Sequence, residues 1–122
     1  VSFVGNVHEG PHALNGRNTT LMRPGMIVTD EPGVYETDLV GIRIENELVC
    51  VHKADNQYGT FLGFEPIMFV PIATSPIVPG VLTKDELDWL NNYHRQVFEK
   101  LAPRLNDEER EWLAKKCAAI GC

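Results

Sequence analysis

The stretch VTDEPGVYETDLVGIRIEN, residues 28–46, places two carboxylates, Glu31 and Glu45, in segments that otherwise have the pattern of β-strands. Pro32 biases Glu31 toward extended backbone and ends its strand, because proline donates no N–H. Around Glu45, the stretch GIRIENELVCVH over 41–52 has the pattern of a strand, and because side chains alternate faces along a strand, Arg43 and Glu45 should share one face. Each glutamate could be a solvated surface acid, one half of a salt bridge or a metal ligand.

The composition narrows the class of protein. The 122 residues are 43% hydrophobic and 23% charged, which is typical of a soluble globular domain. The net charge of −6 argues against binding to nucleic acid, which needs a basic face. No apolar run approaches the roughly 20 residues that cross a bilayer, and no signal peptide opens the chain. We therefore expect neither a nucleic-acid partner nor a membrane partner.

Three cysteines, Cys50, Cys117 and Cys122, form an odd set without CxxC spacing. This argues against a disulfide framework or a zinc ribbon and favours a reducing, cytoplasmic location. Cys50 falls in an apolar strand, so we expect a small buried hydrophobic residue there. No neighbouring base would activate a cysteine thiolate, and we expect no catalytic cysteine.

The order of patterns along the chain predicts an α+β protein. Strands are expected over 26–31, 41–52 and 60–72, with a turn-rich connection between the first two. Thr83 and Glu86 form a capping-box signature before a helix over 84–101. Asn106 and Glu109 open a second helix, which we expect to continue over 107–120 and to stop at Gly121.

The aromatic residues of this helical tail predict packing in the core or a subunit contact. They are Trp89, Tyr93, Phe98 and Trp112.

The stretch NVHEGPH, residues 6–12, is the other candidate for chemistry. His8 lies between an apolar stretch and the turn formed by Glu9, Gly10 and Pro11. It could simply bond to the backbone at a strand end, or it could be held at a cleft where it transfers protons. His12 lies beyond the turn and is expected to face solvent. For Arg43 and Glu45, a mutual salt bridge and a metal site with a balancing guanidinium both remain open.

The stretches NVHEGPH, PGMIVTDEPGVYE and GIRIENELVCV, in this order, resemble the aminopeptidase P (Xaa-Pro aminopeptidase) branch of the pita-bread metallopeptidases. The later FEPIMFVPI and LTKDELDWLNNYHRQVFEKL are similar to the C-terminal segment of the cytosolic-type members. The resemblance covers about residues 2–120. It implies the C-terminal half of a pita-bread fold, with a curved antiparallel sheet followed by a two-helix tail. Residues 1–58 would belong to the catalytic domain and 59–122 to the C-terminal segment.

The resemblance also implies a reaction and roles for four residues. Family members remove an N-terminal residue that precedes proline, using two divalent ions held by two Asp, one His and two Glu. Glu31 and Glu45 match the two Glu ligands, and Glu31 would also help to deprotonate the nucleophile. His8 matches the histidine that binds substrate and stabilises the oxyanion or passes a proton. Arg43 matches a supporting arginine beside the bridging Glu45. Manganese is the expected metal, with cobalt or zinc as alternatives.

Three of the five ligands that the resemblance implies are missing. The two Asp and the His would lie upstream of Val1, so we expect this chain to be a C-terminal fragment that is inactive alone and whose metal site is absent or incomplete. The resemblance extends a homodimer and proline-containing peptide substrates to the full-length protein. A prolidase-like or creatinase-like enzyme of the same fold remains open. So does a non-catalytic domain that binds peptides or histones.

Overall fold

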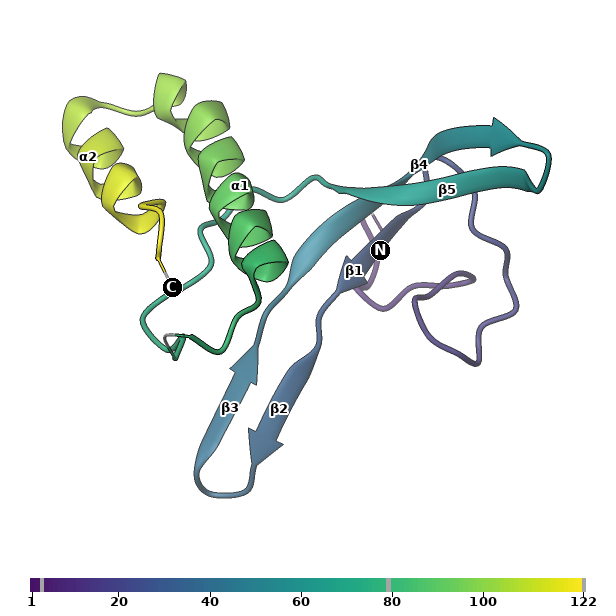
Figure 1. Ribbon diagram of the computed structural model, residues 1–122. Helices are drawn as coiled ribbons and strands as arrows, with labels where there is room; N and C mark the ends of the chain where they lie inside the picture. The colour runs from purple at the N-terminus through teal and green to yellow at the C-terminus, as the bar shows by residue number, and fades with distance from the viewer. Residues whose placement is uncertain (3, 79, 122) are drawn as a thin grey trace. The chain divides into compact units, whose positions relative to one another are not determined.

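The computed structural model describes residues 1–2, 4–78 and 80–121. The chain divides into two compact units, Val1–Met68 and Phe69–Cys122. The strands of the described residues lie in the first unit and the helices in the second (Figure 1). Among these residues no helix is both long enough and apolar enough to cross a membrane. The antiparallel strands followed by two helices confirm the predicted α+β class.

The first unit contains a three-stranded sheet and a two-stranded extension of it. The sheet has the order β1-β4-β5 and the extension pairs β2 with β3, and all neighbours are antiparallel. The strands are β1 (Ile27–Asp30), β2 (Gly33–Glu36), β3 (Val40–Arg43), β4 (Asn46–Asn56) and β5 (Gly59–Pro66). Val28 and Cys50 are buried in this unit, with 4% and 1% of their surface exposed. The expectation that Cys50 is a small buried hydrophobic residue is confirmed.

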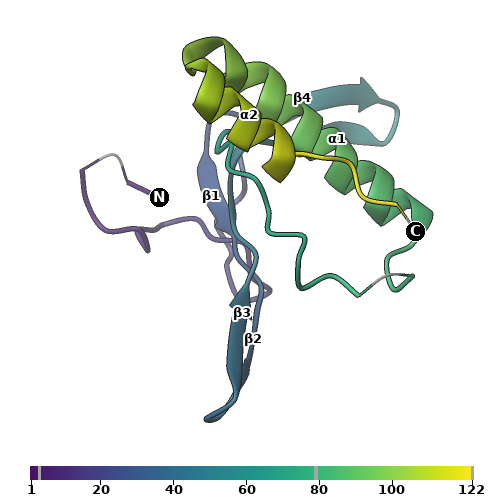
Figure 2. The same cartoon turned by 90° about the vertical axis from the view of Figure 1, so that its left-hand side faces the viewer.

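The β1–β4 pair and the β2–β3 pair share one register. Ile27 pairs with Val49 in the sheet, and Gly33 pairs with Arg43 in the extension, with the same offset. Between them, the Ile44 N–H donates to the Pro32 carbonyl at 3.3 Å. The β2–β3 hairpin therefore continues β1 and β4 away from β5, as the two views in Figures 1 and 2 show.

Two strand predictions need correction. The single strand predicted over 41–52 is split at Ile44 and Glu45, because Pro32 on the opposite strand has no N–H to donate. The turn-rich connection is itself a hairpin, closed where the Leu39 N–H donates to the Glu36 carbonyl at 3.1 Å. The strand predicted over 60–72 is too long, since β5 ends at Pro66, where a proline removes a ladder donor.

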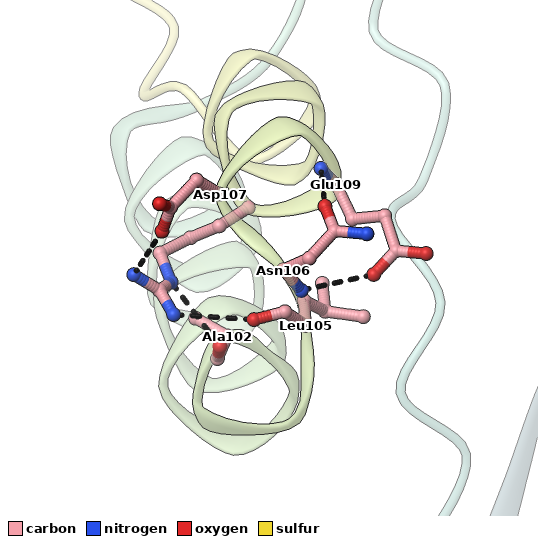
Figure 3. A network of polar contacts seen from close by, with 6 residues as sticks. Ala102, Leu105, Asn106, Asp107 and Glu109 are labelled. Carbon is pink, nitrogen blue, oxygen red and sulfur yellow. Dashed lines mark hydrogen bonds and ion pairs between the residues drawn. The ribbon is translucent and has the colours of Figure 1, made fainter.

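The helices of the second unit begin where the capping signatures predict. α1 spans Lys84–Leu101, and Thr83 and Glu86 form both bonds of the capping box. α2 spans Asp107–Lys116 and begins with a second capping box, in which Asn106 and Glu109 bond each other's backbone N–H (Figure 3). A short 3₁₀ turn, η1 (Ala102–Arg104), contains Pro103 and joins the two helices.

α2 ends earlier than the sequence predicts. It stops at Lys116 rather than continuing to residue 120. The Asn91 side chain on α1 donates to the Ile120 carbonyl and accepts from the Ile120 N–H, both at 3.0 Å. This two-point contact satisfies the backbone of Ile120 outside a helix and holds it against α1.

The core of the second unit forms between α1, α2 and the segment 69–72. Tyr93, Val97 and Leu113 are its buried residues, and Phe69 and Ile72 pack against them. Of the aromatic residues predicted to pack, Tyr93 is buried, whereas Trp89 and Trp112 are 59% and 56% exposed.

α1 also satisfies the backbone of this segment, which lies outside the strands and helices. The Tyr93 hydroxyl donates to the Val70 carbonyl at 2.9 Å, and His94 Nε2 accepts from the Ile72 N–H at 3.1 Å. Backbone groups that lie outside a sheet need such partners when they are buried.

The His94 contact predicts how the stability of the second unit depends on pH. His94 is fully buried, and this burial lowers its pKa below the ordinary value of 6.5. The unfolded chain therefore binds the proton more readily, so the free energy of unfolding should decrease as the pH falls below about 6.5. We expect His94→Gln to remove most of this decrease between pH 7.5 and about 5.5, because its side-chain oxygen still accepts from Ile72 without titrating. Urea unfolding of both proteins at each pH measures the difference, and equal slopes would contradict it.

Candidate functional site

The register of the long hairpin places Glu31 opposite Glu45. Both residues lie at the interruption between the two ladders, directly after the Asp30–Asn46 pair. The Ile44 N–H to Pro32 bond and the Cys50 N–H to Met26 bond mark the hydrogen-bonded pairs of this hairpin. Because such pairs alternate with non-hydrogen-bonded ones, Glu31 and Glu45 form a non-hydrogen-bonded pair, whose Cα atoms are typically about 4.5 Å apart. Their side chains emerge on the same face.

Glu31 is held by two neighbours on that face. The Thr29 hydroxyl donates to Glu31 Oε1 at 2.8 Å. Arg43 donates to Glu31 Oε2 at 3.0 Å and also to the Glu31 backbone carbonyl. The Glu31 side chain is consequently only 26% exposed. Both carboxylate oxygens are thus fixed by protein donors, one neutral and one cationic.

Arg43 forms its ion pair across the hairpin with Glu31. The sequence left open a salt bridge with Glu45, two residues along the same strand, but the guanidinium turns to the opposite strand. Glu45 is exposed and makes no hydrogen bond or ion pair with another residue of the described ranges. The two carboxylates therefore differ in environment, since the charge of Glu31 is balanced by Arg43, whereas Glu45 is exposed and has no cationic partner among the described residues.

Tyr35 supports Arg43 from the side away from Glu31. The Arg43 guanidinium carbon lies 5.5 Å from the centroid of the Tyr35 ring, within the range of a cation–π contact. Two glycines make room for this ring. A Cβ at Gly33 would lie 2.8 Å from the Tyr35 hydroxyl oxygen, and one at Gly41 would lie 2.9 Å from a ring carbon. Sequence reasoning missed Tyr35, although glycines two residues before it and directly opposite it were the available signal.

His8 approaches Glu31 from the N-terminal segment. Its Nε2 lies 3.9 Å from Glu31 Oε1, and its side chain is 85% exposed. Segments 7–15 and 28–32 together line a pocket of about 650 Å³ that includes both residues. The structure therefore brings His8, Glu31 and Arg43 together, with Glu45 next to them by register.

The prediction that His12 faces solvent is wrong. His12 is half-buried, and its Nε2 lies 2.9 Å from the Ile27 carbonyl. No sequence pattern indicated this contact, because it joins residues fifteen positions apart through a loop.

These residues could provide part of a metal site. Two carboxylates emerging side by side repel each other unless a cation lies between or beside them, and oxygen ligands suit hard divalent ions. Arg43 neutralises Glu31 in part, whereas Glu45 keeps its ligand capacity. Within the part of the chain that the structure describes, no group of three or more His, Cys, Asp or Glu side chains could hold a metal. The chain thus offers two carboxylate ligands rather than a closed site.

The two cysteines among the described residues, Cys50 and Cys117, lack the features of a reactive thiol. Cys50 is buried, and burial raises the pKa of the Cys117 thiol. Burial of this kind keeps a thiol inaccessible or protonated. Cys122 lies outside the described residues.

Comparison with known proteins gives two family matches that together cover most of the chain. Residues 2–52 match metallopeptidase family M24, and residues 60–120 match the C-terminal region of peptidase M24. The chain is 46% identical to Aminopeptidase P2 of Arabidopsis thaliana over 115 residues, and 41% identical to the Probable Xaa-Pro aminopeptidase P of Coprinopsis cinerea over 123 residues. These alignments cover 88% and 94% of this chain, but only 16% and 20% of the relatives.

The chain also resembles a solved structure. The X-prolyl aminopeptidase of Caenorhabditis elegans, described as a cytosolic enzyme with a di-nuclear active site, matches with a TM-score of 0.70 and 36% sequence identity. The match covers 81% of this chain and 17% of the nematode enzyme. The family motifs, the fold and these relatives agree, and the chain belongs to metallopeptidase family M24, as a segment that spans about a fifth or less of the aminopeptidases P that it matches.

Proposed function

We propose that the full-length protein is a metal-dependent Xaa-Pro aminopeptidase, which hydrolyses the N-terminal residue from peptides with proline at the second position. The observation that carries this proposal is the register that pairs Glu31 with Glu45 on one face of the hairpin. The names of the matched relatives support the substrate class, and the nematode neighbour supports a two-metal centre.

Glu31 and Glu45 are the proposed metal ligands in this chain. Two bound divalent ions would supply an activated water and a clamp for the tetrahedral intermediate. Manganese is the proposed metal, with cobalt or zinc as alternatives, because carboxylate oxygens favour hard or borderline ions. The remaining three ligands would come from outside this segment, so we propose that the segment alone is inactive.

The other residues act around these ligands. Glu31, held in place by Thr29 and Arg43, is proposed to help remove the proton from the nucleophile. His8 projects into solvent beside Glu31, where it can bind the peptide carbonyl or give a proton to the leaving nitrogen. Arg43 fixes the orientation of Glu31 and limits the excess negative charge of the site.

Three other functions are distinguishable by assay. A prolidase-like enzyme would cleave only dipeptides that end in proline, and a creatinase-like enzyme would act on creatine rather than on peptides. A non-catalytic domain that binds peptides or histones would bind such ligands without hydrolysis. The retained pair Glu31 and Glu45 favours an enzyme, because a binding domain has no need of two facing carboxylates.

Replacing Glu45 tests the metal-ligand assignment. In the full-length protein, Glu45→Gln should lower kcat/KM for an Xaa-Pro peptide by more than about a hundredfold. The loss of a residue that supports a metal ligand costs up to about a hundredfold, and the loss of the ligand itself should cost more. The metal content, measured by mass spectrometry, should fall as well. Glu36→Gln removes the same charge from an exposed position of the hairpin and should leave both values unchanged. Near-normal turnover by Glu45→Gln would refute the assignment.

Arg43 should matter for activity more than for stability. Arg43→Met should lower kcat/KM about ten- to hundredfold by releasing Glu31, as the loss of a residue that orients a metal ligand commonly does. The free energy of unfolding should change by less than about 1 kcal/mol, because the Arg43 side chain is 40% exposed. Lys53→Met, which breaks the exposed Lys53–Glu65 pair, is the matched control and should not affect activity. Equal losses of activity in the two variants would contradict a role at the site.

We also propose that the full-length protein is a cytoplasmic homodimer and that the helices contribute to the contact. Trp89 and Trp112 are more than half exposed, and large exposed aromatic residues are enriched in interfaces. Trp89→Lys should convert the dimer to a monomer in light scattering at micromolar concentration, whereas Gln96→Lys on the same helix should not. A dimer that survives Trp89→Lys and Trp112→Lys together would exclude these helices from the contact.

A further inference from the structure

Residues 8–12 form a short segment along β1, which we call the strap, with His8 and His12 at its two ends. His12 lies four positions after His8, and Glu31 lies four positions after Ile27. His12 Nε2 contacts the Ile27 carbonyl at 2.9 Å, and His8 Nε2 lies 3.9 Å from Glu31 Oε1. The segment 8–12 therefore runs antiparallel to 27–31, with a side-chain contact at each end and the 650 Å³ pocket beside it.

The strap is also held from its other side. The Pro11 carbonyl accepts from Asn18 Nδ2 at 2.9 Å and from the Thr20 hydroxyl at 3.0 Å. Asn15 in turn accepts from the backbone N–H groups of Arg17 and Asn18. These bonds order the loop after the strap, but none of them reaches β1. Of the hydrogen bonds between described residues, the His12 bond is the one that joins this segment to the strand leading to Glu31.

The chemistry of the contact fixes the state of the His12 ring. A carbonyl oxygen only accepts, so Nε2 must carry the proton and donate it. The Nδ1 atom is buried and has no hydrogen-bond partner among the described residues. The ring is thus held by one directional bond, and a side chain that cannot place an N–H at the Nε2 position cannot replace it.

We propose that His12 is a positioning residue for His8, and that its bond to the Ile27 carbonyl sets the separation between the His8 imidazole and the Glu31 carboxylate. His8 itself is 85% exposed and makes its contact with Glu31 beyond hydrogen-bond length, so its own side chain does not fix its place. The expected effect of His12 on catalysis rests on the proposed function, whereas its effect on the position of His8 does not.

Two amide substitutions in the full-length protein test the inference. Gln places an N–H near the Nε2 position of histidine and can reach the Ile27 carbonyl, whereas Asn places it near Nδ1 and cannot. We expect His12→Asn and His12→Ala to lower kcat for an Xaa-Pro peptide about ten- to hundredfold, as small misplacements of a reacting group do, with KM and metal content little changed. His12→Gln should retain most of the wild-type kcat.

A double variant separates positioning from general damage to the fold. In the background of His8→Ala, adding His12→Asn should cause no further loss of kcat, because the residue that His12 positions is already absent. Independent, multiplying losses would overturn the proposal, as would equal kcat values for His12→Asn and His12→Gln.

Crystal structures of the full-length His12→Asn and His12→Gln variants give a readout without activity. The separation between His8 Nε2 and Glu31 Oε1 should increase in the Asn variant and stay near 3.9 Å in the Gln variant. An unchanged separation in both variants would overturn the inference. If the wild-type protein does not cleave Xaa-Pro peptides, the proposed function fails, and this comparison still decides the role of His12.

Discussion

The missing N–H of Pro32 governs how the first unit presents its carboxylates. In an uninterrupted ladder, Glu31 and Glu45 would form an ordinary non-hydrogen-bonded pair of a regular sheet, and each of the two flanking pairs would form two hydrogen bonds. Because Pro32 accepts from Ile44 but returns no bond, the ladder is broken while the register is kept. The two glutamates therefore lie at the break and still face each other. A loop of the same length could bring them close, but it would not fix which face they share.

Electrostatic repulsion explains why hydrogen-bond donors surround Glu31 at the interruption of the ladder. Two carboxylates about 5 Å apart repel by roughly 0.8 kcal/mol in water and by about 3 kcal/mol at an effective dielectric constant of 20. Arg43 and Thr29 offset this for Glu31, and the Tyr35 ring restricts where the guanidinium can go. Glu45 receives no such compensation within the described residues. The site is thus arranged so that a further positive charge, bound beside Glu45, would lower its energy.

The features that could be predicted from the sequence are local ones. Both capping boxes connect residues three positions apart, and the start of each helix followed directly from them. Likewise, the alternation of Arg43 with its neighbours was enough to place its side chain on the face of Glu45. The end of α2 could not be predicted, because it depends on Asn91, which lies 29 positions from its partner Ile120. The Arg43–Glu31 ion pair and the contact of His12 with Ile27 could not be predicted for the same reason. Each joins residues on opposite sides of a turn or loop, and the sequence does not determine the geometry of that connection.

The two units provide hydrogen-bond partners for their backbone groups in different ways. In the first unit the partners are neighbouring strands, whereas in the second unit some of them are side chains of a helix. The segment 69–72 lies against the core outside any strand or helix, and Pro71 makes it a poor partner for another strand. α1 supplies the missing partners from its side chains, with Tyr93 bonding Val70 and His94 bonding Ile72. Consecutive positions of one helix thus bond alternate residues of this segment, and replacing either residue by alanine would remove a hydrogen bond as well as a packed ring. For this reason Tyr93 and His94 are buried on a helix whose neighbouring Trp89 is exposed, and the pattern of burial along α1 follows the segment it holds rather than hydrophobicity alone.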